Sequence, residues 1–176
     1  MKKITLLGFI VLIITATPVH AEGMYVGVKL GQASYGYSGV TNNDQAAFGL
    51  LAGFVITENA AIEVAYDGLG GFDSNSGNVT GRAFSLSGIG SIRLNPQFSL
   101  FGKLGLASTT LDDRAKPGFV GDVSYSNLGL NVGLGAQYNI SPFVSVKAGL
   151  DSFKVGNANS NSDRVRTVYL GANFKL

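Results

Sequence analysis

The sequence predicts an all-β fold, an eight-stranded antiparallel up-and-down transmembrane β-barrel, from three observations. Apolar residues alternate with polar or small residues, at a period of two, in eight separate segments. Tight turns and long polar connections alternate between those segments, as they do in outer-membrane barrels. One face of the alternation is almost purely aliphatic and aromatic, and the other carries glycine, serine, asparagine and a few charges.

The first four expected strands span 24–31, 47–56, 62–67 and 84–94. Their apolar faces are, strand by strand, Met24, Val26, Val28 and Leu30; Phe48, Leu50, Ala52, Phe54 and Ile56; Ile62, Val64 and Tyr66; and Phe84, Leu86, Ile92 and Leu94, with Gly88 and Gly90 between. The residues between these apolar positions are mostly small or polar, so each segment has the two different faces of a strand that separates two environments.

The last four expected strands span 100–106, 127–138, 144–151 and 167–176. Their apolar faces are Leu100, Leu104 and Leu106 with Gly102; Leu128, Leu130, Val132, Leu134, Ala136 and Tyr138; Val144, Val146, Ala148 and Leu150; and Val168, Leu170, Ala172, Phe174 and Leu176. Most of the eight segments approach the 9–11 residues that a tilted strand needs to cross a bilayer.

The connections are short and long in turn. Tight turns are expected at 57–60, 95–97 and 141–142, where Asn, Pro and Ser are typical turn residues. Long polar loops are expected at 34–45, 69–81, 108–126 and 154–166. An even number of strands puts both termini at the short-turn, periplasmic end, so the four long loops are expected to face outward.

A soluble barrel of the lipocalin kind also alternates, but it would point its apolar face inward. Here the small and polar face is a poor core, whereas the aliphatic face suits lipid, in which a charge at the midplane costs about 2–4 kcal/mol. Aromatic residues at strand ends are expected to form two interfacial girdles: Phe54, Phe98, Tyr138, Phe143 and Phe174 near the turns, and Phe48, Tyr66 and Phe84 near the loops.

Residues 1–21 are expected to be a cleaved signal peptide, and residues 22–176 one barrel domain. Lys2 and Lys3 precede an apolar run of 13 residues at 4–16, and Ala21 ends a small-residue cleavage site. The alternative is a membrane anchor, although a spanning helix needs roughly 20 apolar residues. The chain has no cysteine, so neither a disulfide framework nor a lipidated cysteine is expected.

The expected mature chain carries 11 basic and 11 acidic residues, since Lys2 and Lys3 leave with the signal. It has no basic patch that would suggest nucleic acid as a partner. Its only histidine, His20, also lies in the signal, so the usual general base of acyl-transfer chemistry is missing. We therefore expect no enzyme activity, no catalytic residues, no metal site and no cofactor.

The polar faces bring charged residues into the expected lumen, which in an eight-stranded barrel is just wide enough for side chains to fill. These interior residues are expected to form an ionic network: Lys29, Glu63, Asp67, Lys103, Lys147 and Asp151, with Lys175 as a further lysine. One interpretation is that the ion pairs only fill and rigidify the interior. The other is that they gate a narrow ion path.

Five segments carry a resemblance to a known family: YVGVKLG (25–31), AIEVAYDGLG (61–70), LFGKLGL (100–106), GAQYNISPFVSVKAGL (135–150) and VYLGANFKL (168–176). Together they resemble the OmpA-like eight-stranded membrane domain, and in size the chain is closer to the OmpX-like members. The resemblance implies a buried ion-pair network that includes Lys29, Glu63, Lys103 and Lys147. The chain departs from the family at Gln137, where an inward Glu is usual, and at Ile89, where a lysine is usual.

The last strand also resembles the C-terminal signal that the outer-membrane assembly machinery reads. The matching residues are Tyr169, Gly171, Phe174 and Leu176, although most family members end in Phe. The resemblance therefore implies that this machinery is a partner.

The expected function is a structural or surface-interaction role, adhesin-like, exerted through the four long extracellular loops. The alternative is a narrow, low-conductance ion pore gated by interior salt bridges. The expected location is the bacterial outer membrane, and the expected partners are outer-membrane lipids, lipopolysaccharide and host or surface ligands. The barrel is expected to be a monomer.

Overall fold

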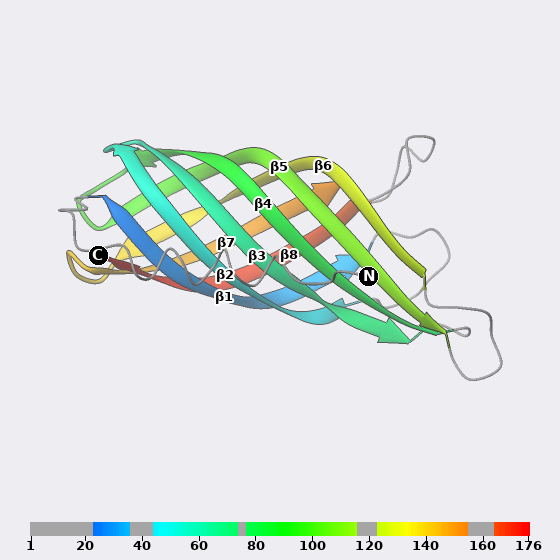
Figure 1. Cartoon of the computed structure of the whole chain (residues 1–176). Coiled ribbons are helices and arrows are strands. Elements are labelled where there is room, and N and C mark those ends of the chain that lie inside the picture. The colour runs from blue at the N-terminus through cyan, green and yellow to red at the C-terminus, as the bar shows by residue number, and fades with distance from the viewer. Residues whose placement is uncertain (1–22, 36–43, 74–76, 116–122, 155–163) are drawn as a thin grey trace.

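A computed structural model describes residues 23–35, 44–73, 77–115, 123–154 and 164–176. Its eight strands are β1 Met24–Tyr35, β2 Asp44–Thr57, β3 Ala60–Asp73, β4 Gly77–Arg93, β5 Phe98–Ala115, β6 Val123–Asn139, β7 Val144–Lys154 and β8 Arg164–Lys175. Each strand pairs antiparallel with the next, and β1 pairs with β8 to close the barrel (Figure 1). The predicted fold is therefore confirmed. The expected signal peptide lies outside the described residues.

The three tight turns lie where the sequence predicts them, at the end of the barrel that holds the C-terminus (Figure 1). Side-chain oxygens stabilise them by accepting backbone N–H bonds. Asn95 Oδ1 accepts from Gln97 N at 2.9 Å and Phe98 N at 2.7 Å. Ser141 Oγ accepts from Val144 N at 3.0 Å. These Asx- and Ser-type turns explain why such short connections join the strands.

The strands extend further at the opposite end than the sequence predicts. The expected loops 69–81 and 108–126 are largely strand, because β3 and β4 leave only 74–76 between them, and β5 and β6 leave only 116–122. This part of the prediction was wrong in extent. Beyond the membrane both faces of a strand meet polar surroundings, so the hydropathy alternation fades while backbone pairing continues.

The outward face of the barrel is an apolar belt. Most large apolar side chains on this face are exposed, Leu170 the most at 69%. The aromatic residues expected in the girdles are among them, except Phe98, which is half-buried. Only a lipid environment makes this much exposed apolar surface favourable. Within the described residues, no helix is both long and apolar enough to cross a membrane.

A bulge interrupts the register between β3 and β4, at Gly68 to Gly71. Gly70 there has a φ of 72°, in the left-handed region that side chains rarely adopt. A Cβ at this position would lie 2.6 Å from the carbonyl oxygen of Ala46. The bulge therefore needs glycine, and it accompanies the buried Leu69 on the lumen side.

Candidate functional site

Six of the seven charged residues that the sequence assigns to the lumen lie inside the barrel and are 6% exposed or less: Lys29, Glu63, Asp67, Lys103, Lys147 and Asp151. They come from β1, β3, β5 and β7, the strands that run outward from the periplasmic end. Period-two alternation puts each on the same side as its strand's small residues. Three lysines thus face three carboxylates, and the buried charges balance.

Asp151 lies between two lysines. Its Oδ2 atom is 2.9 Å from Lys103 Nζ and 3.4 Å from Lys29 Nζ. Lys29 Nζ also reaches Asp67 Oδ1 at 2.7 Å. The contacts run from β3 to β1, β7 and β5, so they tie opposite walls of the barrel together across the lumen.

Glu63 also lies between two lysines, one of which is again Lys103. Its Oε1 atom is 3.4 Å from Lys103 Nζ, and its Oε2 atom is 3.3 Å from Lys147 Nζ. Tyr25 donates its hydroxyl to the same Oε2 atom at 3.0 Å. Lys103 therefore joins Glu63 and Asp151 into one continuous network, which we call the ionic layer. A buried network of this kind is favourable only when its members are paired. Here each charged group contacts an opposite charge, while Asp67 Oδ2 and Asp151 Oδ1 accept no hydrogen bond from the described residues.

Aromatic rings surround the lysines of the ionic layer. Lys147 Nζ lies 4.9 Å from the centre of the Tyr25 ring and 5.4 Å from that of Phe101. Lys29 Nζ lies 5.0 Å from the centre of the Tyr169 ring. These are cation–π distances, so the rings stabilise the ammonium groups away from water. Sequence reasoning did not assign Tyr25 or Phe101 to the network, although both share the inward parity of Lys29 and Lys103.

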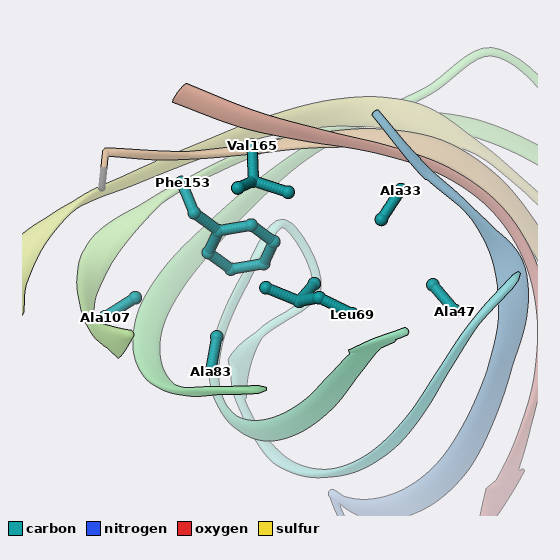
Figure 2. Packing of buried hydrophobic residues seen from close by; sticks show 7 residues of the cluster. All are labelled: Ala33, Ala47, Leu69, Ala83, Ala107, Phe153 and Val165. Atoms are coloured by element: carbon teal, nitrogen blue, oxygen red, sulfur yellow. The ribbon is translucent and has the colours of Figure 1, made fainter. Parts of the chain in front are cut away.

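A second layer of the lumen is apolar. Figure 2 shows its seven side chains directed into the barrel from strands all around the wall: Ala33, Ala47, Leu69, Ala83, Ala107, Phe153 and Val165. Leu69 and Phe153 each lie two residues beyond an ionic residue of the same strand, toward the outer end. We call this cluster the apolar layer. It lies on the extracellular side of the ionic layer and leaves Phe153, Leu69 and Val165 fully buried.

The periplasmic end of the lumen is open by comparison. A cavity of about 330 Å³ with a mixed lining lies there; its polar side chains include Arg93, Gln137, Lys147 and Lys175, and its apolar ones include Ile89 and Phe101. Lys175 is exposed and forms no salt bridge with the described residues, so it belongs to this cavity and not to the ionic layer. The lumen thus passes from cavity to ionic layer to apolar layer.

The two departures from the resembled family lie on the inward face. Ile89 packs with Phe101 and Tyr169 in an apolar cluster, where a lysine would meet aromatic rings. Gln137 pairs in register with Lys147 and bonds to Asn139 at 2.9 Å. Neither residue offers an alternative charged partner to Glu63.

The residues of the expected assembly signal divide between the two faces of β8. Tyr169 is inside the barrel, whereas Phe174 is exposed on the apolar belt. Gly171 pairs with Lys29 of β1, and Leu176 donates its backbone N–H to the Met24 carbonyl at 3.0 Å. The same residues therefore also close the barrel.

Among the described residues, no group of three or more His, Cys, Asp or Glu side chains is placed to hold a metal ion. The candidate site is therefore the layered lumen, together with the surface at the outer end of the barrel.

Comparisons with known proteins agree with this architecture. A sequence profile of the outer membrane protein beta-barrel domain matches residues 4–175. No curated protein matches the chain. Among solved structures, Neisserial surface protein A is similar with a TM-score of 0.75 and 18% identity, covering 88% of this chain and 97% of that one.

Two further structures are similar. Ail, the attachment invasion locus protein of Yersinia pestis, has a TM-score of 0.64 and 20% identity, and the match covers 87% of this chain and 98% of that one. The N-terminal β-barrel domain of Pseudomonas aeruginosa OprF has a TM-score of 0.58 and 17% identity, and the match covers 85% of this chain and 97% of that one. At these identities the likeness describes the fold alone.

Proposed function

The chain belongs to the outer membrane protein β-barrel domain family, and from that premise we propose that it is a membrane-anchored surface protein whose outward connections bind ligands outside the cell. The closed lumen carries the proposal. The ionic and apolar layers fill the barrel from wall to wall, so the surface at its outer end is the part that remains for interaction.

The names of two similar structures support this role. One is called a surface protein and the other an attachment invasion locus protein. A rigid barrel that presents connections at one end suits such a role, because loops can vary without disturbing the scaffold. Host molecules and lipopolysaccharide are the proposed ligand classes.

The test replaces the outer connections 36–43, 116–122 and 155–163, one at a time, with short glycine-serine segments. Replacement of 74–76, the shortest outer connection, is the matched control. We expect at least one of the three variants to assemble as a heat-modifiable barrel and to lose binding to cells or to lipopolysaccharide. Variants that assemble and bind every surface as well as the parent would overturn the proposal.

The second candidate is the narrow pore gated by interior salt bridges. The cavity and the ionic layer favour it, since together they place charged side chains in the periplasmic half of the lumen. A conducting path would also need the apolar layer to open, because Phe153, Leu69 and Val165 are fully buried beyond the charges. We therefore rank the pore below the surface role.

We infer that the protein is not an enzyme. The expected mature chain has no histidine or cysteine, so a Ser–His or Cys–His pair cannot form. The inference is checked by incubating the purified barrel with lipid A and measuring released fatty acid. Deacylation above that of a heat-unfolded sample would contradict it.

A further inference from the structure

Three basic residues lie together on the outer face of the barrel, at the extracellular end of β7 and β8. We propose that Lys154, Arg164 and Arg166 bind the phosphate groups of a phosphorylated lipid in the outer leaflet, of the lipid A type. All three side chains are exposed, and their parity directs them away from the lumen, since their neighbours Phe153 and Val165 point inward. We call them the basic cluster.

The register places like charges directly against each other. Lys154 pairs with Arg164 across β7 and β8, and Arg166 is two residues further along the same face. Like charges directly opposite one another destabilise a sheet. An anion between them turns this repulsion into attraction.

The described residues supply no acidic partner there. No described acidic side chain lies within salt-bridge distance of the basic cluster. The connecting segment 155–163 contains one acidic residue, Asp163, and no basic one, whereas the strands on either side of it carry Lys154, Arg164 and Arg166. Arg82, an outward arginine at this end outside the basic cluster, differs, because its NH2 lies 2.9 Å from Asp112 Oδ2.

The basic cluster lies at the edge of the apolar belt. On β8 the outward residues are Leu170, Val168 and then Arg166. At a rise of 3.3–3.4 Å per residue, Arg166 lies about 7 Å along the strand from Val168, the last apolar residue of the belt. On β7, Ser152 separates Leu150 from Lys154. With the long connections outside the cell, this edge is the level of the outer-leaflet head groups.

The chemistry of the basic cluster fits phosphate. Arginine presents a planar fork of donors that can bind phosphate in a bidentate way, and lysine adds a compact positive charge. The side chains project from the barrel wall beside lipid-facing leucines, so their neighbour is a membrane lipid. A head group with two phosphates could contact both arginines.

The first test compares stability in two bilayers. Lys154→Gln removes the like-charge pair, so in phosphocholine vesicles it should shift the folding equilibrium toward the folded barrel, by up to about fivefold. In vesicles that contain bisphosphorylated lipid A the same substitution removes a phosphate contact and should shift the equilibrium the other way. Urea titration followed by gel mobility measures both. The same sign in both bilayers would overturn the proposal.

The second test measures lipid binding to the folded barrel in phosphocholine nanodiscs. Wild type should bind bisphosphorylated lipid A more tightly than its dephosphorylated form, and added salt should weaken that binding. Each substitution to glutamine in the basic cluster should weaken it by roughly fivefold. Arg82→Gln, the control in an ion pair at the same end, should change it less than twofold.

Equal wild-type affinity for the two forms of lipid A would overturn the proposal without any variant, even if a substitution prevents folding. The proposal rests on the outer-membrane location. It shares lipopolysaccharide with the proposed surface role, but it depends on the basic cluster of the barrel wall and not on the outer connections. Binding to cells could therefore fail while lipid A binding persists, or the reverse, and the two results separate the proposals.

Discussion

Lys103 is the residue on which the ionic layer depends most, because it alone contacts both Glu63 and Asp151. Lys103→Met should destabilise the folded barrel by about 3–5 kcal/mol, since it leaves buried carboxylates with fewer partners. Urea-induced unfolding in vesicles measures the change.

Lys175→Met is the matched control for Lys103, because Lys175 is exposed at the periplasmic end. Its effect should stay within about 0.5 kcal/mol. Similar losses for the two lysine variants would contradict the assignment of Lys103 to a buried network.

Tyr25 donates a hydrogen bond to an ionised partner, Glu63, within the barrel. Tyr25→Phe keeps the ring over Lys147 but removes this bond, so we expect a loss of about 1.5–3 kcal/mol in the free energy of unfolding. Tyr66→Phe, on the exposed belt, should be nearly neutral in the same titration. A neutral result for Tyr25→Phe would mean that its hydroxyl contributes no net stabilisation.

At the scale of single residues, the sequence predicted which charges face the lumen, because alternation assigns a side to every residue of a strand. It did not predict the apolar layer. Leu69 and Val165 fell in segments assigned to loops. They could have been predicted only by extending the alternation of Asp67 and Thr167 beyond the expected strand ends, since each lies two residues away on the same inward face. Which lysine meets which carboxylate depends on the stagger of the closed barrel, which hydropathy does not encode.

At the scale of strands, β6 and β7 approach closely at Gly133, which pairs with Asp151. A Cβ on Gly133 would collide with Asp151 Oδ1 and lie 3.0 Å from the Leu150 carbonyl oxygen. Gly133→Ala should therefore displace Asp151 from the lysines and destabilise the barrel by about 1–3 kcal/mol.

Gly90 provides the control for Gly133, since a Cβ there would have no neighbour within 4 Å. Gly90→Ala should be neutral or stabilise by up to about 1 kcal/mol, through the unfolded chain. The measurement compares the urea unfolding midpoints of Gly133→Ala and Gly90→Ala. Equal midpoints would show that the close approach of β6 and β7 has no energetic consequence.

The last strand both closes the barrel and carries the expected assembly signal. Deleting Phe174 to Leu176 should leave export intact but block insertion in cells, because the assembly machinery loses its recognition residues. The deletion also removes the hydrogen bond from the Leu176 N–H to Met24. Refolding of the purified variant in detergent separates the two effects. If the deletion variant still forms a heat-modifiable barrel in the outer membrane of cells, these residues are not needed as an assembly signal.

The centres of all eight strands were predictable from sequence, but their outer ends were not. In 108–115 both faces contain threonine and aspartate, so the sequence pattern is that of a loop although β5 pairs with β6 as far as Asp113. Backbone hydrogen bonds do not require apolar side chains, and outside the membrane nothing forces the two faces to differ.

For the whole molecule, the inverted distribution of polarity decides the fold and the location together. An apolar exterior around a polar or charged interior is unfavourable in water and favourable in lipid, and closure pairs the backbone of every strand. Composition and alternation therefore predicted the membrane barrel. They could not predict a ligand, because binding by outer connections depends on loop side chains that follow no periodic rule.

The central claim is that this barrel is a closed anchor and not a channel. Single-channel recording of the refolded protein in planar bilayers tests it most directly, with insertion verified by heat-modifiable mobility. We predict no discrete openings for the wild-type barrel, because the ionic layer and the apolar layer block the lumen in series. Discrete wild-type openings would contradict the claim. Openings that change in conductance or disappear in Glu63→Ala and Lys147→Ala would also favour the gated pore.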